Sequence, residues 1–343
     1  MYSKACQYYK VAAKRASLLL TKTTPPMSKV VTYSPAYTIV PTYECFNRCT
    51  YCNFRTNPGK SPWLDLSTAR NKLLELQTQG VCEVLILSGE VHPRSPRRQV
   101  WFNLVYDLCN LAISLGFLPH TNVGPLSFAE MSQLKTVNAS MGLMLEQLTP
   151  KLLQTVHQHA PSKVPALRLQ QLEWAGQLQI PFTTGLLLGI GETVDDWRET
   201  LKAIANLHQR YGHIQEVILQ PHSPGSQQSF NASALKPQQL IEAIFIARQI
   251  LPLEITIQIP PNLVAQPSLL FACLEAGARD LGGIGPKDEV NPDYPHISAE
   301  KLANILVLDV WQLMPRLPIY PQYESWLSPN LQANYYKWQI TIK

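Results

Sequence analysis

The chain has 343 residues, of which 45% are apolar and 15% charged, the balance of a globular protein with a sizeable core. Its length suits one large α/β barrel or two ordinary domains, and no apolar run reaches the roughly 18 residues that would span a membrane. Six of the 29 basic residues lie within residues 1–30, and the first acidic residue is Glu44. The rest of the chain therefore has 23 basic and 24 acidic residues, which nearly balance. We therefore expect neither a nucleic-acid nor a membrane partner.

Residues 1–30 are basic, free of acid and rich in Ser and Thr. We interpret them as a disordered extension, or as the product of an upstream start codon with Met27 as the true start. A transit or membrane-surface segment is the alternative. Residues 31–343 are then a single domain with an aromatic, Pro-rich tail. A large chain without a secretory signal is expected in a reducing compartment, here the cytoplasm.

From residue 37 onwards, strand patterns alternate with helix patterns. Short β-rich runs are each followed by a segment with helical apolar spacing, and Gly80, Gly116 and Gly212 close three of these helices. The predicted strands are 37–43, 81–87, 118–123, 139–145, 182–188, 214–220, 254–259 and 280–284. The predicted helices are 66–79, 100–115, 128–134, 165–178, 194–211, 237–250, 268–276 and 298–311.

Eight strand-then-helix units are the count of a (βα)8 barrel of the TIM type, although a doubly wound open sheet shows a similar alternation. The positions of the candidate functional residues favour the barrel. Most candidate residues come just after strands of several different units, where the carboxyl ends of barrel strands place an active site. The tail, residues 315–343, is expected to pack over one end of the barrel.

Three of the seven cysteines lie in the segment Cys45-Phe-Asn-Arg-Cys49-Thr-Tyr-Cys52, after the first predicted strand. Iron–sulfur clusters are held by cysteine thiolates, and a [4Fe–4S] cluster held by only three of them keeps one iron open for a ligand. Structural zinc is the alternative, but it needs four ligands, and the next candidates, Cys82 and His92, do not make a familiar zinc spacing. Cysteines without a metal role are a further alternative.

The C-x3-C-x2-C spacing, with Tyr51 before the third cysteine, resembles the signature of the radical S-adenosylmethionine superfamily. The resemblance implies a [4Fe–4S] cluster on Cys45, Cys49 and Cys52, S-adenosylmethionine on the open iron, and a low-potential electron donor. One electron then releases a 5′-deoxyadenosyl radical, so the cofactors carry the chemistry and we assign no other catalytic residue.

Further elements extend this resemblance. Residues 88–90 are similar to a Gly-Gly-Glu element that contacts the methionine amino group, with Ser in first place. Residues 185–192 are similar to a G-x-I-x-G-x-x-E element beside the adenine, and a tight strand-to-helix turn is the alternative. Glu146 and Arg168 could hold the ribose hydroxyls and the methionine carboxylate, or form an ordinary surface pair. The cofactor-binding candidates are Ser88, Gly89, Glu90, Glu146, Arg168, Gly189, Gly191 and Glu192.

The second half of the chain resembles one family of that superfamily, the G subunit of 7,8-didemethyl-8-hydroxy-5-deazariboflavin synthase. The segments that carry this resemblance are 181–192, 211–217, 260–263, 282–286 and 290–292. The resemblance runs from about residue 37 to about residue 313. It implies a lyase that converts a small-molecule adduct of tyrosine and ribitylaminouracil, made by a partner H subunit, with loss of ammonia. Candidate substrate contacts near predicted strand ends are His213, Gln220, Asn262, Asp288 and Asn291, for which capping or loop roles are the alternative.

Other functions remain open from the sequence. One is another radical enzyme, such as a biotin-synthase-like sulfur inserter, a tyrosine lyase or an H-subunit-like protein. A sulfur inserter needs a second cluster, and Cys82, Cys109 and Cys273 lie in apolar patterns where cysteine packs as a small hydrophobe. The remaining alternative is a non-catalytic metal-binding protein, which would not cleave S-adenosylmethionine.

Overall fold

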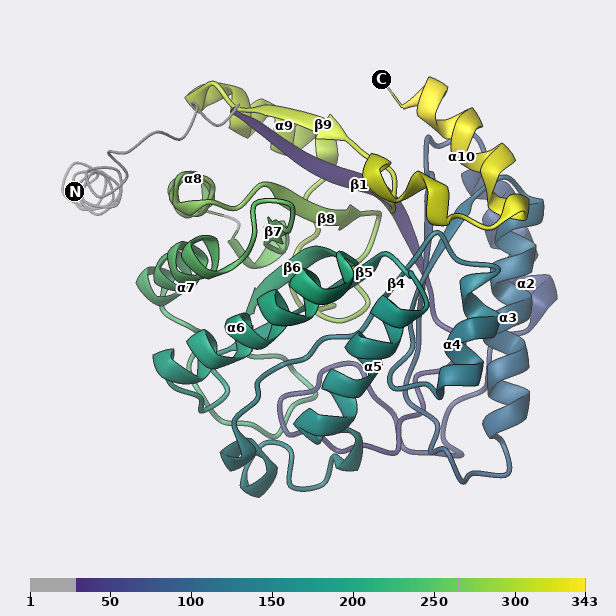
Figure 1. Cartoon of the computed structure of the whole chain (residues 1–343), viewed down its shortest axis with the longest axis horizontal. Helices are drawn as coiled ribbons and strands as arrows, with labels where there is room; N and C mark the ends of the chain where they lie inside the picture. The colour runs from purple at the N-terminus through teal and green to yellow at the C-terminus, as the bar shows by residue number, and fades with distance from the viewer. Residues whose placement is uncertain (1–28, 265, 343) are drawn as a thin grey trace.

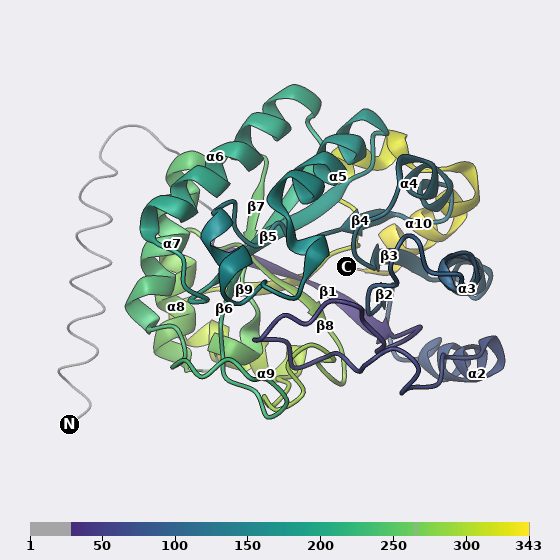
Figure 2. The ribbon, with the colours of Figure 1, turned by 90° about the horizontal axis from the view of Figure 1, so that it is seen from below.

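A closed barrel of eight parallel strands forms the centre of the computed structural model, which describes residues 29–264 and 266–342. The strands follow one another around the barrel in chain order, and β1 closes it by pairing with both β2 and β8. Helices pack around the outside (Figures 1 and 2). The predicted (βα)8 fold is confirmed. Residues 1–28 of the predicted N-terminal extension lie outside the described residues.

The elements agree closely with the predicted ones in the middle of the chain. The strands are β1 (Val30–Ile39), β2 (Glu83–Leu87), β3 (Leu118–Asn122), β4 (Ser140–Gly142), β5 (Phe182–Leu188), β6 (Ile214–Pro221), β7 (Thr256–Gln258), β8 (Asp280–Ile284) and β9 (Gln312–Pro315). The helices are α2 (Leu66–Leu76), α3 (Arg98–Ser114), α4 (Phe128–Lys135), α5 (Pro165–Gln177), α6 (Val194–Tyr211), α7 (Pro237–Ile250), α8 (Pro267–Ala276), α9 (Ala299–Leu306) and α10 (Pro329–Thr341).

Strand β1 begins seven residues before the predicted start at residue 37, because it has two partners along one edge. Its second half pairs with β2, whereas Val30–Tyr33 pairs with β9, a strand that the sequence did not predict. The opposite edge pairs with β8. Strand β1 therefore extends beyond the barrel and holds the start of the C-terminal tail in place.

The tail covers the end of the barrel at which the strands begin, as predicted. Leu331, Tyr335 and Trp338 of α10 pack with Cys82 and Leu118, which lie at the starts of the second and third strand units. The indole of Trp338 donates to the carbonyl of Gly116 over 2.7 Å, and Figure 1 shows α10 lying beside α3. The opposite end, where the strands finish, is left for the loops that carry the site.

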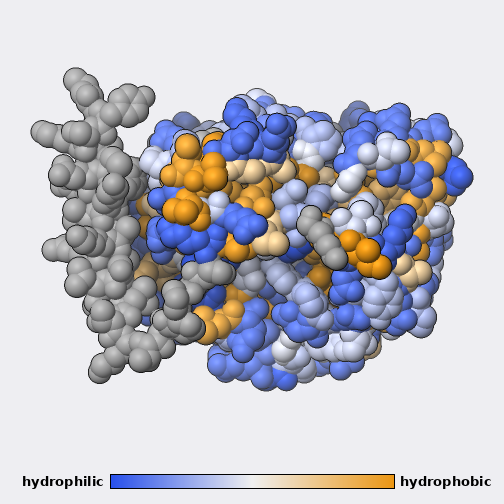
Figure 3. Space-filling model, turned by 90° about the horizontal axis from the view of Figure 1, so that it is seen from above, coloured by the Kyte–Doolittle hydropathy of each residue, from blue (hydrophilic) through white to orange (hydrophobic). Residues whose placement is uncertain are grey.

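Apolar side chains from the strands and the surrounding helices form the main core, in which Trp101, Phe117 and Phe182 are almost fully buried. On the face seen in Figure 3, hydrophobic side chains gather in separate patches among hydrophilic ones. Among the described residues, no helix is long and apolar enough to span a bilayer. The barrel interior differs from the core because it contains buried polar side chains, among them Glu83, His120 and Glu216.

Candidate active site

The three clustered cysteines lie in one loop, residues 45–52 (the cysteine loop), at the carboxyl end of the barrel. Backbone hydrogen bonds fix both of its sides: Cys45 N–H donates to Thr56 O over 3.1 Å, and Cys52 N–H donates to Cys49 O over 3.2 Å. All three cysteines are half-buried free thiols. The loop therefore presents three sulfur ligands from one short, anchored segment.

These cysteines fit an iron–sulfur cluster better than zinc. A zinc site requires several ligands around one ion, and the described part of the chain contains no group of three or more His, Cys, Asp or Glu side chains that could hold a single ion. Burial raises the pKa of Cys45 to about 11 and of Cys49 to about 12. The thiolates therefore need a positive partner, which the irons of a cluster supply. The positive charge of Lys163 also favours the thiolate of Cys49, because it acts to lower the pKa of that thiol.

Glu90 connects the cysteine loop to the wall of the barrel. Its carboxylate accepts a hydrogen bond from Asn47 Nδ2 over 2.8 Å and from Arg168 Nη2 over 3.0 Å, and it also accepts from the Ser162 hydroxyl. Asn47 belongs to the cysteine loop, whereas Ser162 lies in a short 3-10 helix, Pro161–Lys163, before α5. A carboxylate held by three donors is fixed in position next to the cysteines.

The two residues before Glu90 keep this strand end tight against the cysteine loop. A Cβ on Gly89 would lie 2.2 Å from the carbonyl oxygen of Glu44, so only glycine fits there. The Ser88 hydroxyl accepts from Trp101 Nε1 over 3.0 Å and donates to the Gly89 carbonyl over 2.8 Å. Serine in place of the expected glycine is therefore accommodated by its own hydrogen bonds.

Glu146 and Arg168 do not form the surface pair considered from the sequence. Arg168 is 1% exposed, bonds to Glu90, and donates to the Met144 carbonyl over 2.6 Å. Glu146 instead pairs with Lys163 and holds a left-handed backbone conformation, with φ at 66°. Burial acts to raise the pKa of Glu146, but Lys163 and Arg168 outweigh it and hold this pKa below its ordinary value.

These side chains surround a cavity of about 330 Å³ at the carboxyl end of the barrel, which we call the upper cavity. Cys52, Glu90 and Lys163 line it together with residues from several strand ends. The cations Lys163 and Arg168 and the anions Glu90 and Glu146 thus converge beside the cysteines. Recognition of a zwitterionic amino-acid moiety requires groups of both charges. Of the eight cofactor-binding candidates, the structure brings four to this cavity: Ser88, Glu90, Glu146 and Arg168.

Comparison with known proteins identifies the family. Residues 39–204 match the Radical SAM superfamily. The chain is 72% identical over 317 residues to the 7,8-didemethyl-8-hydroxy-5-deazariboflavin synthase of Trichormus variabilis, covering 92% of this chain and 93% of that protein. The synthase of Trichodesmium erythraeum is 63% identical over 316 residues, covering 92% and 99%. The chain belongs to the 7,8-didemethyl-8-hydroxy-5-deazariboflavin synthase family of radical S-adenosylmethionine enzymes.

Solved structures with the same fold are more distant in sequence. The [FeFe]-hydrogenase maturase HydG from Carboxydothermus hydrogenoformans superposes with a TM-score of 0.71 at 16% identity, covering 100% of this chain and 83% of that one. Methylornithine synthase gives a TM-score of 0.67 at 15% identity, with 95% and 94% covered. These two enzymes therefore share the fold of this chain, although their sequences are only distantly similar to it.

In this member of the synthase family, the second glycine-containing element forms a tight turn. Gly189 and Gly191 have φ of 90° and 116°, which glycine adopts without strain. The Glu192 carboxylate accepts from the Gly189 and Ile190 amides, over 2.6 and 2.8 Å, and from Trp197 Nε1 over 2.8 Å. Leu187 lines the upper cavity, whereas Gly189, Gly191 and Glu192 lie outside its lining and shape the strand end that carries it.

The predicted substrate contacts divide between two neighbouring cavities. Gln220 and Asn291 line the upper cavity, and Asn262 and Asp288 line a second cavity of about 190 Å³, the lower cavity. The Asp288 carboxylate accepts from Asn262 Nδ2 over 2.8 Å and from the Val290 amide over 2.8 Å. Four of the five candidates therefore surround one continuous region of the barrel.

His213 does not join them. It precedes β6 at the end opposite to the site, and its Nε2 lies 2.8 Å from the carbonyl oxygen of Leu172 in α5. Burial lowers the pKa of His213 to about 3, so the ring is neutral. It packs between the barrel wall and α5, and we leave it out of the substrate site.

Several residues of the site gave no signal in the sequence. Lys163 follows a proline in a segment that resembles an ordinary turn, yet it pairs with Glu146. His157 lies 2.9 Å from the Tyr51 hydroxyl, beside the cysteine loop. The first contact joins residues 17 positions apart and the second joins residues 106 positions apart, so spacing within one short segment could not have predicted either.

Proposed function

We propose that the protein converts 5-amino-5-(4-hydroxybenzyl)-6-(D-ribitylimino)-5,6-dihydrouracil, the tyrosine–ribitylaminouracil adduct, to 7,8-didemethyl-8-hydroxy-5-deazariboflavin. Loss of ammonia in this reaction makes the enzyme a carbon–nitrogen lyase. The observation that carries the proposal is the 72% identity, over 92% of the chain, to a relative of that name. In this proposal a partner H subunit supplies the adduct, a low-potential donor supplies the electron, and the reaction takes place in the cytoplasm.

In this proposal Cys45, Cys49 and Cys52 hold the [4Fe–4S] cluster and S-adenosylmethionine occupies the upper cavity. Together these cofactors supply the radical that removes a hydrogen atom from the adduct. Glu90 is an acceptor for the methionine amino group, and Arg168 with Lys163 are donors for the methionine carboxylate. The upper cavity opens towards the lower one, which leaves room for the adduct beside the cofactor.

The positions of the other cysteines do not favour a sulfur inserter. Cys82 and Cys273 are buried at 0% exposure, and the Cys109 sulfur accepts from Asn138 Nδ2 over 3.5 Å within the core. None of these three lines the upper or the lower cavity. A second, sacrificial cluster beside the substrate would have no cysteine ligand among them.

Anaerobic reconstitution with iron and sulfide, followed by reduction and assay with the synthetic adduct, tests the proposal. We expect 5′-deoxyadenosine and a fluorescent deazaflavin to form together. Formation of 5′-deoxyadenosine without the deazaflavin would reject the assigned substrate while keeping the radical chemistry. Release of p-cresol-type fragments from free tyrosine would instead identify a tyrosine lyase.

Replacing Glu90 with Ala is expected to weaken S-adenosylmethionine binding about tenfold to a hundredfold and leave the cluster spectrum in place. The reason is the loss of a fixed anionic acceptor, since hydrogen bonds to charged groups contribute about 1.5–3 kcal/mol. Equilibrium titration of the reconstituted protein with S-adenosylmethionine measures the change.

Two further variants make this result specific. Glu90→Gln keeps the side-chain volume and removes the charge, and should weaken binding in the same direction. Glu173→Ala, a half-exposed carboxylate paired with Arg210 on the surface, is the control and should bind normally. Wild-type affinity in Glu90→Ala would show that Glu90 supports the loop without contacting the cofactor.

A further inference from the structure

The lower cavity follows the axis of the barrel away from the cysteines. It shares lining residues with the upper cavity, including Leu85, Asn122 and Ile218, so the two are adjacent. Glu83, His120 and Arg316 line its far end, near the starts of the strands. None of these three residues lines the upper cavity, so the cofactor site does not account for this end of the lower cavity.

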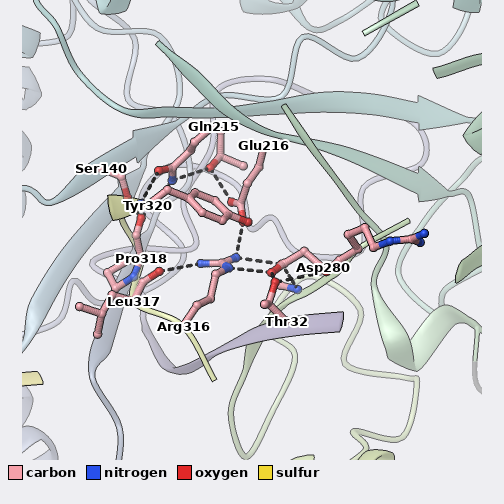
Figure 4. Close-up of polar contacts among 12 residues, drawn as sticks. Thr32, Ser140, Gln215, Glu216, Asp280, Arg316, Leu317, Pro318 and Tyr320 are labelled. Carbon is pink, nitrogen blue, oxygen red and sulfur yellow. Dashed lines mark hydrogen bonds and ion pairs between the residues drawn. The ribbon is translucent and has the colours of Figure 1, made fainter. Parts of the chain in front are cut away.

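Arg316 comes from the tail just after β9 and lines the far end of the lower cavity, and Figure 4 shows its guanidinium between Asp280 and Glu216. Its guanidinium donates to both oxygens of Asp280, from Nε over 2.6 Å and from Nη2 over 2.8 Å, and it also pairs with Glu216. The Tyr320 hydroxyl donates to Glu216 over 3.1 Å, and Thr183 donates to the other oxygen of Glu216 over 2.9 Å. These two carboxylates are therefore occupied by partners from the protein.

The carboxyl group of Glu83 differs from those of Asp280 and Glu216 in its partners. It is 7% exposed, lines the lower cavity, and forms no ion pair among the described residues. Arg316 is already shared between Asp280 and Glu216. Burial raises the pKa of Glu83, and the charge of Arg316 and a hydrogen bond with the Ser34 side chain act in the opposite direction. A buried carboxyl group without a cation favours a ligand that offers neutral hydrogen-bond donors.

His120 offers a second acceptor. The hydroxyl of Ser140 donates its single proton to the Pro318 carbonyl over 2.6 Å, so it must accept from His120 Nδ1, 2.7 Å away. Nε2 of this ring then carries a lone pair. Burial, and secondarily Arg316, lowers the pKa of His120 to about 3, so the ring is neutral and Nε2 remains an acceptor.

The inner half of the lower cavity is thus rich in acceptors, because Glu83, Glu216 and His120 line it, and the one guanidinium there, that of Arg316, is also bound by Asp280 from outside the lining. An anionic group would be repelled there, whereas a chain of hydroxyl groups could donate to Glu83 and His120 in turn. Thr38, Asn122 and Gln258 line the same cavity and supply further neutral polar groups. A narrow, polar, acceptor-rich well matches a flexible polyol.

We propose that the lower cavity binds the polyhydroxylated arm of the substrate, with Glu83 and His120 as the specificity-determining residues. This inference rests on the proposed function, in which the substrate carries a ribityl chain on the ring that reacts. The arm would point along the barrel axis towards Arg316, and the reacting ring would lie next to the upper cavity.

Substrate truncation tests the inference without changing the protein. The reconstituted wild-type enzyme is assayed with the ribityl adduct and with an adduct in which a 2-hydroxyethyl group replaces the ribityl chain. We expect the truncated adduct to have a KM at least about tenfold higher, since about 1.4 kcal/mol of lost hydrogen bonding corresponds to that factor. Equal KM values would overturn the inference and leave the proposed function standing. No deazaflavin from either adduct would reject the proposed function itself.

Variants then assign the contact to residues. Glu83→Gln and His120→Phe should each raise the KM for the ribityl adduct about tenfold and leave the KM for the truncated adduct unchanged. Equilibrium binding of the fluorescent deazaflavin and of its arm-less analogue gives a readout that is independent of turnover. Glu173→Gln is the control for a carboxylate exchanged on the surface. Loss of affinity for both forms of the ligand in both variants would contradict a role in binding the arm.

Discussion

Replacing Cys49 with Ala is expected to abolish the iron–sulfur cluster and the cleavage of S-adenosylmethionine together. Three thiolates from one loop must hold the cluster while one iron stays open, so two thiolates cannot retain it. Cys49 lies between the other two ligands and beside Lys163. Iron and sulfide analysis after anaerobic reconstitution, with an EPR spectrum of the reduced protein, measures the loss, and 5′-deoxyadenosine measures the activity.

Cys273→Ala is the matched control for this variant, because it makes the same chemical change at a cysteine buried in α8. It should keep the cluster and the cleavage, with only a small loss of stability. Cleavage that survives in Cys49→Ala would refute the ligand assignment. Zinc without iron in the wild-type protein would refute the radical chemistry as a whole.

The features that could be predicted from the sequence are those that one segment determines. The spacing of Cys45, Cys49 and Cys52 predicted that three thiols come together on one loop, because neighbours in one segment need no distant partner, and their role as cluster ligands stays a prediction. Helix α6 was predicted to the residue, since Thr193 caps its start and Gly212, with φ at 65°, ends it. The count of eight strand–helix units, together with candidate residues placed just after several different strands, predicted the barrel in preference to a doubly wound sheet.

The features that the sequence did not predict depend on contacts between distant segments. Strand β9 has no strong pattern of its own, and only its pairing with Val30–Tyr33 makes it a strand. His213 was expected near a strand end, and it is, but at the start of β6, where side chains face the helices and not the mouth of the barrel. Arg316 belongs to the tail that was expected to pack over one end of the barrel, but its buried ion pairs were not predicted, because its partners Glu216 and Asp280 lie 100 and 36 residues away.

Replacing Arg316 with Leu is expected to lower the free energy of unfolding by about 3–5 kcal/mol, the usual effect of removing one partner from a buried ion pair. Glu216 and Asp280 would remain inside the barrel without their cation. In the wild-type protein, burial works to lower the pKa of Arg316, but these two carboxylates outweigh it and raise the pKa above its ordinary value. Urea denaturation of the protein without its cofactors measures the change, with Arg210→Leu in an exposed ion pair expected to cost less than about 1 kcal/mol.

The dependence on pH and a compensating variant separate this electrostatic effect from lost packing. Burial raises the pKa of Glu216 to about 7 even with Arg316 present, so removing the cation must raise it further. Between about pH 7 and this higher pKa the folded variant binds more protons than the folded wild-type protein, so the deficit relative to wild type shrinks as the pH falls towards about 7. Adding Glu216→Gln and Asp280→Asn to Arg316→Leu should recover most of the lost stability at neutral pH. A deficit that is reduced neither by lowering the pH towards 7 nor by the added substitutions would mean that Arg316 contributes by filling space and not by its charge.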